Sequence, residues 1–475
     1  MKQNTTMLKR LSSFLLALML CLSMAACASD NGTSSAAESG NAPVSEDSSS
    51  EAGASGEKKV IKFAHMFAES EEGTDVMMAD PYQWVCAAKE KFEAENPDYT
   101  VELEYMDSNT INTKIMTDVA AGVSHDVCLA QSAEMPQHIN ANSLYDISEY
   151  FNAWSEEEQA EFNWNPVWGN LVDENGGLYA IPFGLHTRTI AYRKSMFEAA
   201  GLDPEKTPKD YDELLEYAQK LTDKENDVWG LGIYLGPHQA TCEVVLMPMV
   251  WSRGGTIFDD ATQKATFTDP ACIDSIKWIY DCVYTYEVAP TWTMSGQQSE
   301  TLLAPFLEGQ FAMAFGIGNY WLSETEKAGL TKGAYPATGE VESDVGWFTV
   351  PEDGTTYCNA WLVGVCANSG DPEMAFKLLE ASLDKEVLPK AISYAGLPAR
   401  ASEYEGEVYS ADFWQDWYNM AMDTGHIAPV TPYYNNLKDA IVQATQDIIT
   451  GKNIENVESV LKQYEDDFNA QYAAE

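Results

Sequence analysis

The sequence predicts an α/β protein, and three observations lead to that class. Short apolar runs of strand length alternate with longer segments of helical periodicity from about residue 58 to the C-terminus. The runs are compact and apolar, as expected for strands buried within a mostly parallel sheet. The 475 residues suffice for two large lobes around one cleft, or for two or three ordinary domains.

The first elements follow a strand–helix–strand order. A strand is expected in KKVIKFAHMF, and the next segment, DPYQWVCAAKEKFEAENPD, places apolar residues at helical spacing. The segment YTVELEYM alternates with a period of two, as a strand does, and a helix is expected after it over 108–122. The apolar run DVCLA then completes the pattern as a buried strand.

Several helices are predicted to begin with an oxygen-bearing residue followed by proline. The side-chain oxygen can accept a hydrogen bond from the free N–H groups of the first turn, and proline fits the first helical position. These pairs are Asp80-Pro81, Thr207-Pro208, Asp269-Pro270 and Asp371-Pro372. Two more helices are expected at the C-terminus, and the apolar face of the last one comprises Val457, Val460, Leu461, Tyr464 and Phe468.

The N-terminus has the features of an export signal. Basic residues precede LSSFLLALMLCLSMAA, an apolar stretch too short and too early for a typical spanning helix. Because Met24–Cys27 resembles the bacterial lipobox, residues 1–26 are predicted to be removed and Cys27 to carry a lipid such as palmitate. Residues 27–57, rich in Ser, Ala, Gly and Glu, predict a flexible tether. The folded part is therefore expected outside the cytoplasm, on the outer face of the cell membrane.

The charge balance restricts the partners. There are 28 Lys and Arg residues against 74 Asp and Glu residues, so the formal net charge is −46. Nucleic acid is not expected as a partner, because phosphate binding requires clustered basic residues. The large negative charge also repels anionic membranes and polyanionic ligands.

Nine cysteines are present, and two of them belong to the N-terminal segment. The others show neither a CxxC pair nor a zinc-like spacing with histidine, and most lie in apolar runs. Buried thiols are therefore favoured over a disulfide framework. These seven residues are Cys86, Cys128, Cys242, Cys272, Cys282, Cys358 and Cys366.

The sequence contains few signs of catalysis. It lacks the Walker, HExxH and GxSxG motifs, and the six histidines show no metal spacing. Gly316-Ile317-Gly318 does not complete a GxGxxG motif, because Trp321 takes the place of the third glycine. We therefore expect no enzyme activity, no cofactor and no metal, although the many acids leave a pair of glycosidase carboxylates open.

Aromatic residues lie where predicted strands end. Trp251 precedes a Gly-Gly turn, Tyr320 and Trp321 follow QFAMAFGIG, and Trp361 lies close to Asn359. In open α/β sheets, ligands bind beyond the carboxyl ends of the strands. A flat ring there can cover the C–H face of a sugar while polar side chains hold its hydroxyl groups.

The segment LYAIPFGLHTRTIAYRKSMFEAAGLDPEKTPKDYDELLEYAQKLT resembles the signature of family 1 extracellular solute-binding proteins, the carbohydrate-binding components of ABC importers. Arg193 replaces the usual asparagine of that signature. The matching positions are Tyr179, Pro182, Tyr192, Lys194, Phe197 and Gly201. KFEAENPDYTVEL, WSRGGTIFDD, FLEGQFAMAFGIGNYW and AGLPARAS extend the resemblance from about residue 59 to the C-terminus.

The resemblance implies a two-lobed, periplasmic-binding-protein-like fold of type II, with the ligand in a cleft between lobes joined by crossover strands. Lobe 1 would comprise residues 58–184 and 345–385. Lobe 2 would comprise residues 185–344 and 386–475. The polar interruption at Gly184–Arg188 would then be a crossover between the lobes.

The resemblance also implies a set of ligand contacts. His186 takes the position of an acidic sugar contact of maltose-binding proteins, and Tyr320 takes the stacking position beside Trp321. The other contacts come from the loops after the first and third strands, the crossovers and the second lobe. The expected set is His65, Phe67, Gln131, Glu134, His186, Arg188, Trp251, Asn319, Tyr320, Trp321, Asn359 and Trp361.

The function implied is capture without chemistry. A monomeric lipoprotein would bind a sugar or oligosaccharide between its lobes and deliver it to separate permease subunits of an ABC importer. Three alternatives remain: a non-sugar solute such as a polyamine in the same fold, a surface glycosidase, and a subunit that presents sugar to a membrane sensor.

Overall fold

The computed structural model describes residues 58–69, 81–108, 110–123, 125–162, 167–296, 299–318, 321–334, 337–391, 396–406 and 409–472. All these residues belong to one compact unit, Gly56–Glu475. The predicted signal, the lipid site at Cys27 and the tether lie outside the described residues, as do Asp80, Asn319 and Tyr320.

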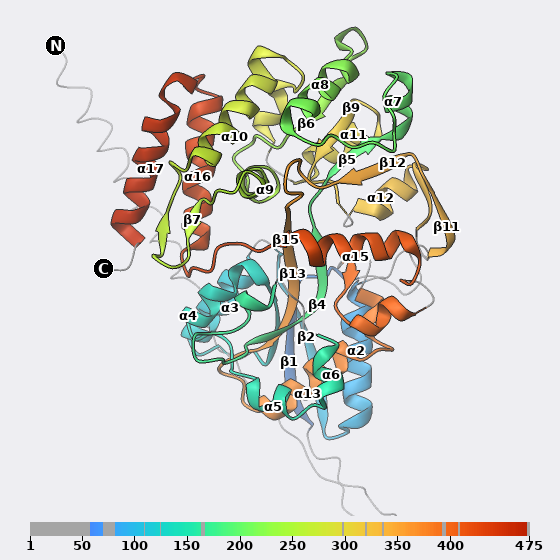
Figure 1. The fold of residues 1–475 in the computed structure, drawn as a ribbon. Coiled ribbons are helices and arrows are strands. Elements are labelled where there is room, and N and C mark those ends of the chain that lie inside the picture. Colours follow the sequence, from blue (N-terminus) through green and yellow to red (C-terminus); the bar gives the residue numbers. More distant parts are fainter. Residues whose placement is uncertain are drawn as a thin grey trace, which may run out of the picture. The chain divides into compact units, whose positions relative to one another are not determined.

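A seven-stranded sheet organises the first half of the fold (Figure 1). Its strands are β1 (Lys59–His65), β2 (Tyr99–Tyr105), β3 (Val127–Gln131), β4 (Ala180–Thr187), β13 (Thr356–Val365), β14 (Leu397–Pro398) and β15 (Gly425–His426). The order is β14-β4-β13-β3-β1-β2, with β15 paired to β13. β1 is parallel to β2 and β3, whereas β13 is antiparallel to both β3 and β4. The sheet is therefore mixed, and the expectation of a mostly parallel sheet is wrong, because β13 returns from a distant part of the chain.

Helices cover this sheet. The main ones are α2 (Pro81–Glu95), α3 (Ile111–Ala120), α4 (Met135–Asn140), α5 (Ser148–Asn152), α6 (Glu156–Ala160), α13 (Pro372–Leu383) and α15 (Asp412–Thr424). Short 3₁₀ turns lie at η1 (Ser132–Glu134), η2 (Val167–Asn170), η9 (Leu388–Ala391) and η10 (Ala401–Glu405). The buried face of α2 contains Trp84, Val85, Ala88 and Phe92, as its periodicity predicts. The Trp84 ring stacks on Phe183 of β4, with 4.4 Å between the centroids.

A smaller sheet organises the second half, in the order β12-β5-β9-β6. Its strands are β5 (Ile190–Arg193), β6 (Trp229–Gly232), β9 (Phe311–Phe315) and β12 (Val345–Phe348). β5 is antiparallel to both β12 and β9, and β6 is parallel to β9. Two ribbons complete the strands, one of β7 (Phe258–Asp259) and β8 (Lys264–Ala265), the other of β10 (Thr331–Ala334) and β11 (Ala337–Ser343).

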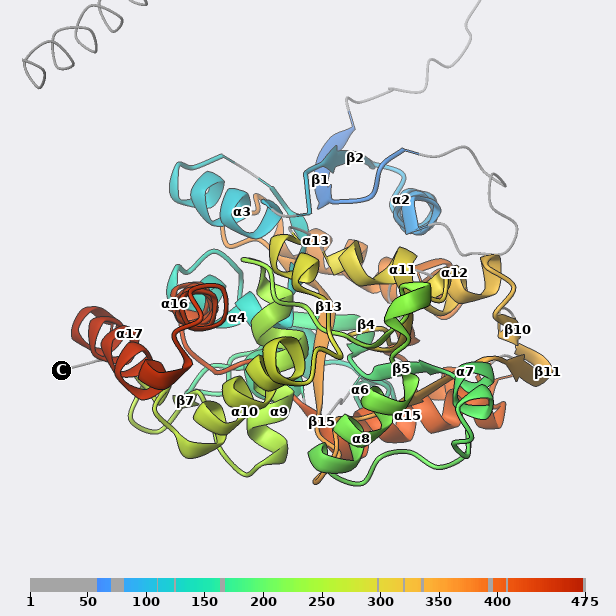
Figure 2. The same cartoon turned by 90° about the horizontal axis from the view of Figure 1, so that it is seen from above.

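The helices of this half are α7 (Lys194–Ala199), α8 (Tyr211–Leu221), α9 (Met247–Ser252), α10 (Pro270–Tyr280), α11 (Leu303–Leu307), α12 (Leu322–Lys327), α16 (Tyr434–Ile449) and α17 (Val457–Tyr472). A π-helical turn, η4 (Thr241–Leu246), leads into α9, and further short turns are η3 (Lys224–Asn226), η5 (Asp281–Thr285), η6 (Thr291–Ser295), η7 (Ser299–Leu302) and η11 (Ile454–Asn456). Figure 2 shows α16 and α17 side by side. α17 buries Val457, Leu461 and Phe468, three members of its predicted apolar face.

Two of the predicted proline caps are confirmed. The Asp269 carboxylate accepts a hydrogen bond from the Ala271 N–H group at the start of α10, and Asp371 caps α13 in the same way. The start at Thr207-Pro208 is wrong, because α8 begins at Tyr211. Asp210 provides the capping oxygen there and accepts from the Glu213 N–H group at 2.8 Å.

The buried apolar side chains form two hydrophobic cores, so the fold is two-lobed. The first core draws mainly on residues 61–185 and 358–421, and the second mainly on residues 190–350 and 428–468. We use lobe 1 and lobe 2 for the elements around these cores. The stretch 386–421, which the sequence assigned to lobe 2, contributes Leu388 and Trp414 to the first core. The chain passes between the cores after β4, before β13 and after β15.

Candidate functional site

Four of the predicted contacts meet where three strands of the large sheet lie side by side. β13 lies between β3 and β4, and its Trp361 is opposite Gln131 on one side and Gly184 on the other. Two residues away, Asn359 is opposite His186. The structure therefore brings together Gln131, His186, Asn359 and Trp361, which come from three separate segments. We call these four residues the strand-end group.

Hydrogen bonds fix the amide of Asn359 within this group. The Ser132 hydroxyl donates to Asn359 Oδ1 at 2.7 Å, and Asn359 Nδ2 donates to Gln131 Oε1 at 3.4 Å. The Ser132 oxygen also accepts from the Ala360 N–H group at 2.9 Å. Since Asn359 is buried and bonded on both sides, the partly exposed Gln131 is the more accessible amide of the pair.

The rings of the strand-end group are also buried. The His186 and Trp361 rings meet edge to face, with 5.9 Å between centroids and 70° between planes. Both residues are less than a tenth exposed. Gln131 is therefore the most exposed member of the strand-end group.

Hydrogen bonds join the crossover segments to each other and to the residues that follow β9. The Arg188 N–H group donates to the Tyr357 carbonyl at 3.1 Å, and the Thr189 hydroxyl donates to the Ile317 carbonyl at 2.8 Å. Gly318 lies so close that a Cβ atom built on it would be 2.3 Å from the Thr187 carbonyl oxygen. Only glycine permits this approach, because a backbone oxygen cannot move away as a flexible side chain can.

A second polar group joins the two lobes, and we call it the interlobe cluster. Its members are Glu134 and Gln137 of lobe 1, and Gln239, Glu243, Asn435 and Lys438 of lobe 2. Asn435 Nδ2 donates across the boundary to Glu134 Oε1 at 3.5 Å and to Gln137 Oε1 at 3.4 Å. Glu134 lies three residues after Gln131, so the cluster continues from the strand-end group.

Lys438 is the cation of the interlobe cluster. Its ammonium group lies 3.6 Å from Glu243 Oε1 and donates to Gln239 Oε1 at 3.2 Å. The Tyr434 hydroxyl donates to the same Glu243 oxygen at 2.8 Å. Burial raises the pKa of Glu134, and the positive charge of Lys438 opposes that shift. The cluster therefore holds two carboxylates against one ammonium group.

Among the residues that the structure describes, several polar atoms near this boundary are buried without a hydrogen-bond partner. They are Glu134 Oε2, Gln137 Nε2 and both side-chain polar atoms of Asn170, which lies in η2 against η1. Buried polar atoms are normally satisfied by protein, water or ligand. Donors and acceptors of this kind suit the hydroxyl groups of a small polar molecule.

His65 is the last residue of β1 and Phe67 follows the strand, and both are buried. Their rings stack with 6.4 Å between centroids, and the Phe67 N–H group donates to His65 Nδ1 at 3.3 Å. Burial lowers the pKa of His65 to about 4, so its ring is neutral at physiological pH. β1 is parallel to β3, and both residues therefore lie at the same edge of the sheet as Gln131.

Two predicted tryptophans pack in lobe 2. Trp251, at the end of α9, stacks on His426 at 5.3 Å and on Tyr357 at 6.4 Å between centroids. Trp321 is buried in the second core. Their role as ligand contacts stays a prediction.

The sequence prediction did not include Gln239, Glu243, Asn435 or Lys438. One signal was available, because Lys438 falls within the apolar stripe that α16 buries with Leu437 and Ile441. A buried lysine is rare unless it is paired, and it therefore marks a partner elsewhere in the fold. The sequence does not show that this partner is Glu243, 195 residues earlier in the chain.

Membrane spans and metal sites can be assessed for the part of the chain that the structure describes. Within it, no helix combines the length and apolar character that crossing a membrane requires. No group of three or more His, Cys, Asp or Glu side chains in the same residues is arranged to hold a metal ion.

Comparison with known proteins identifies related chains. A family model described as "Bacterial extracellular solute-binding protein" matches residues 77–388. A maltotriose-binding protein of Pyrococcus abyssi is 20% identical over 80% of this chain and 77% of its own length. An erythritol/L-threitol-binding protein of Mycolicibacterium smegmatis is 23% identical over 75% of this chain and 76% of its own length. The crystal structure of a solute-binding protein from Thermotoga lettingae, bound with α-D-tagatose, superposes with a TM-score of 0.70 at 22% identity, covering 87% of this chain and 99% of that one.

Proposed function

The chain belongs to the bacterial extracellular solute-binding proteins, and from this premise we propose that it captures a sugar or oligosaccharide between its two lobes for an ABC importer. The observation that supports this most is the interlobe cluster, in which polar side chains of both lobes face one another. A ligand that bonds to both lobes favours one arrangement of them by its differential affinity.

The composition of the site favours a neutral ligand rich in hydroxyl groups. Amides are present on both sides of the boundary, at Gln131 and Gln137 of lobe 1 and at Asn435 of lobe 2. A polyamine would instead require several carboxylates without a cation, and Lys438 already pairs with Glu243. The relatives that are named for a maltotriose and for tetritols support the same class of ligand.

The setting of this activity completes the proposal. Cys27 would carry the lipid and residues 27–57 would tether a monomeric body to the outer face of the membrane. Separate permease subunits would receive the sugar, and the bound sugar would be released intact. The twelve contacts predicted from the sequence form our working map of the site, to which the interlobe cluster adds Asn435 and Lys438.

A thermal-shift screen of the mature chain tests this proposal. A ligand that binds only the native state raises the melting temperature, by an amount that grows with its concentration relative to Kd. The panel should contain neutral monosaccharides and oligosaccharides, polyols and polyamines. We expect a sugar or polyol to raise the melting temperature and to be recovered without cleavage of any glycosidic bond.

Two variants localise the effect. Asn435→Ala removes the amide that bridges the lobes, and Asn456→Ala changes an exposed asparagine of lobe 2 as a matched control. We expect the first to weaken the shift strongly and the second to leave it unchanged. A panel in which only polyamines raise the melting temperature, or in which sugar is hydrolysed, would overturn the proposal.

A further inference from the structure

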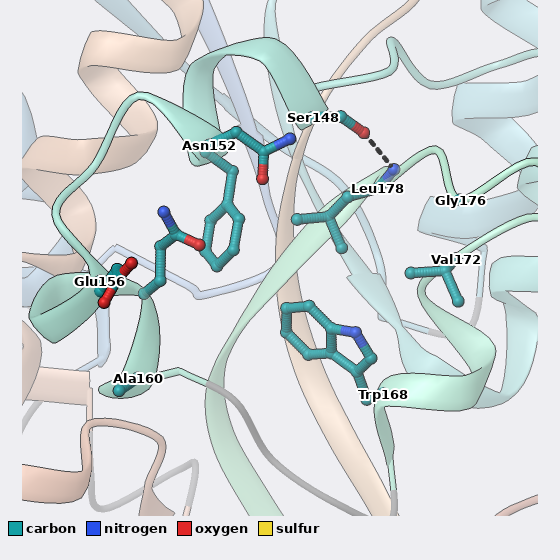
Figure 3. A pocket seen from close by; sticks show the side chains of 10 residues that line it. Ser148, Asn152, Glu156, Ala160, Trp168, Val172, Gly176 and Leu178 are labelled. Atoms are coloured by element: carbon teal, nitrogen blue, oxygen red, sulfur yellow. Dashed lines mark hydrogen bonds between the residues drawn. The ribbon is translucent and has the colours of Figure 1, made fainter.

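Lobe 1 contains a cavity separate from the interlobe cluster, and we call it the lobe 1 pocket. It has a volume of about 390 Å³ and lies among α5, α6, η2 and the turn 171–178. Its walls include Phe151, Asn152, Glu156, Gln159, Trp168 and Leu178. Figure 3 shows the Trp168 ring on one side of the cavity, with Asn152 and Leu178 on the other.

The turn that forms one wall is held by two carboxylates. Asp146 Oδ1 accepts from the Leu178 N–H group at 3.2 Å and from the Ser148 hydroxyl at 2.5 Å, and that hydroxyl in turn accepts from Leu178 at 2.8 Å. Asp173 accepts from the Gly177 N–H group at 2.8 Å and from the Tyr179 hydroxyl at 3.0 Å. The wall is therefore preformed, and a ligand that enters the pocket does not have to order it.

The remaining side chains offer one apolar surface and several polar groups. Trp168 is partly exposed, and the buried Phe151 supports it with 5.8 Å between ring centroids. Asn152 and Glu156 are exposed at the rim. Gln159 uses its N–H donor on the Trp154 carbonyl at 2.9 Å, which directs its amide oxygen to other donors. An indole face beside amide and carboxylate groups is the combination that binds a sugar ring and its hydroxyl groups.

We propose that the lobe 1 pocket is a second binding site, for one neutral saccharide unit. None of the described residues that line the pocket is a Lys or Arg. Glu156 begins a helix whose first turn also carries Glu157, whereas the third glutamate of that turn, Glu158, is paired with Arg400. Phosphorylated and uronic acid sugars are therefore repelled. A neutral ring avoids this repulsion and can donate its hydroxyl protons to the carboxylate and amide oxygens.

The pocket is separate from the site between the lobes. All its walls belong to lobe 1, so its binding does not depend on the angle between the lobes. Leu178 lies just before the start of β4, and His186 lies near the other end of that strand. At about 3.3 Å per residue, roughly 20 Å of strand separates Ala180 from His186. The second site would hold sugar at the surface of the protein whether or not the first is occupied.

Ligand-observed NMR and calorimetry on the mature chain test this inference. The probes are maltose, cellobiose and methyl α-D-glucoside, with glucuronate and choline as charged counter-probes. We expect a weak class of sites with a Kd near 1 mM, the range of a single small contact surface. Trp168→Ala should weaken this class at least tenfold. Asn152→Ala, which changes an exposed side chain and leaves the core intact, should weaken it severalfold.

Matched variants separate this inference from the proposed function. Trp292→Ala removes a tryptophan of lobe 2 that is 40% exposed, and it should leave the weak class unchanged. Asn435→Ala should affect only the interlobe site. If this variant loses binding at the interlobe site and keeps the weak class, the two sites are separate. Neutral-sugar binding that neither Trp168→Ala nor Asn152→Ala alters would overturn the inference. The inference would also be overturned if no weak class of sites is found, or if the pocket binds choline or glucuronate in preference to neutral sugars.

Discussion

Replacing Lys438 by methionine should destabilise the protein far more than the removal of an exposed lysine. The Lys438 and Glu243 side chains are only 9% and 12% exposed, and their charged atoms are 3.6 Å apart. At that distance, with an effective dielectric constant near 20, Coulomb's law gives an attraction of about 4–5 kcal/mol. Removing one partner of a buried pair typically costs about 3–5 kcal/mol, because the other charge stays buried without compensation.

Urea denaturation at pH 7 provides the measurement. Lys438→Met keeps most of the apolar stem, so the loss of charge dominates, and we expect the free energy of unfolding to fall by about 3–5 kcal/mol. The control is Lys220→Met on α8, whose ion pair with Glu216 is shorter, at 2.7 Å, but about half exposed. It should cost at most about 0.5 kcal/mol.

A double variant checks the physical reason. Adding Glu243→Gln to Lys438→Met removes the stranded carboxylate and should restore more than half of the lost stability. The reasoning fails if Lys438→Met costs no more than Lys220→Met, or if the double variant is as unstable as the single one.

Three further predictions concern ionisable groups. Because burial raises the pKa of Glu134, the native carboxyl group binds its proton at a higher pH than the unfolded one, and wild-type stability gains as the pH falls towards 4.5. Glu134→Gln lacks this gain. The unfolding free energy of the variant minus that of wild type should therefore be most positive at pH 7 and should decrease towards pH 4.5 in urea titrations. His65 has the opposite sign: its pKa falls from 6.5 to about 4, and up to about 3 kcal/mol of stability is lost between those pH values, which His65→Gln should not show. Among the seven cysteines from Cys86 onward, iodoacetamide should modify the partly exposed Cys86 first in the native protein, and mass spectrometry would contradict this if the six buried thiols reacted as fast.

The elements that sequence patterns predicted well are those that depend on neighbouring residues. The apolar face of α2 follows from spacing within one helix, and the caps at Asp269 and Asp371 follow from adjacent residues. The start of α8 was misplaced because two capping oxygens compete there. Thr207 precedes a proline, but Asp210 stands directly before the apolar stripe and makes the capping bond.

The arrangement of the sheets was beyond such patterns. A buried apolar strand has the same sequence signature whichever way its neighbours run. Nothing in Thr356–Val365 therefore shows that β13 inserts antiparallel between β3 and β4. The division of the lobes has the same cause, since the packing of residues 386–421 with the first core depends on contacts far away in the sequence.

The parts of the candidate site that the sequence predicted are those whose residues lie within one short segment. The polar residues up to Arg188 are visible in one segment, and they indicated a crossover at Gly184–Arg188. The structure keeps Gly184–Thr187, with His186, inside β4, and the chain passes between the lobes just after that strand. The interlobe cluster joins Glu134 to residues about 300 positions later, so only Lys438, a charge within an apolar stripe, could point to it.

On the proposed function, the geometry of the lobe boundary would let a bound sugar control the arrangement of the lobes. Within lobe 1, the Ser132 hydroxyl and Asn359 are joined by a bond of 2.7 Å, whereas the bonds from Asn435 to Glu134 and Gln137 measure 3.5 and 3.4 Å. Bonds at the long end of the range are weak. Ligand hydroxyl groups with better geometry would replace them at little cost, and they would also satisfy the buried atoms that lack partners among the described residues. Under that proposal the arrangement of the lobes would follow the occupancy of the site, as delivery of a ligand to a permease requires.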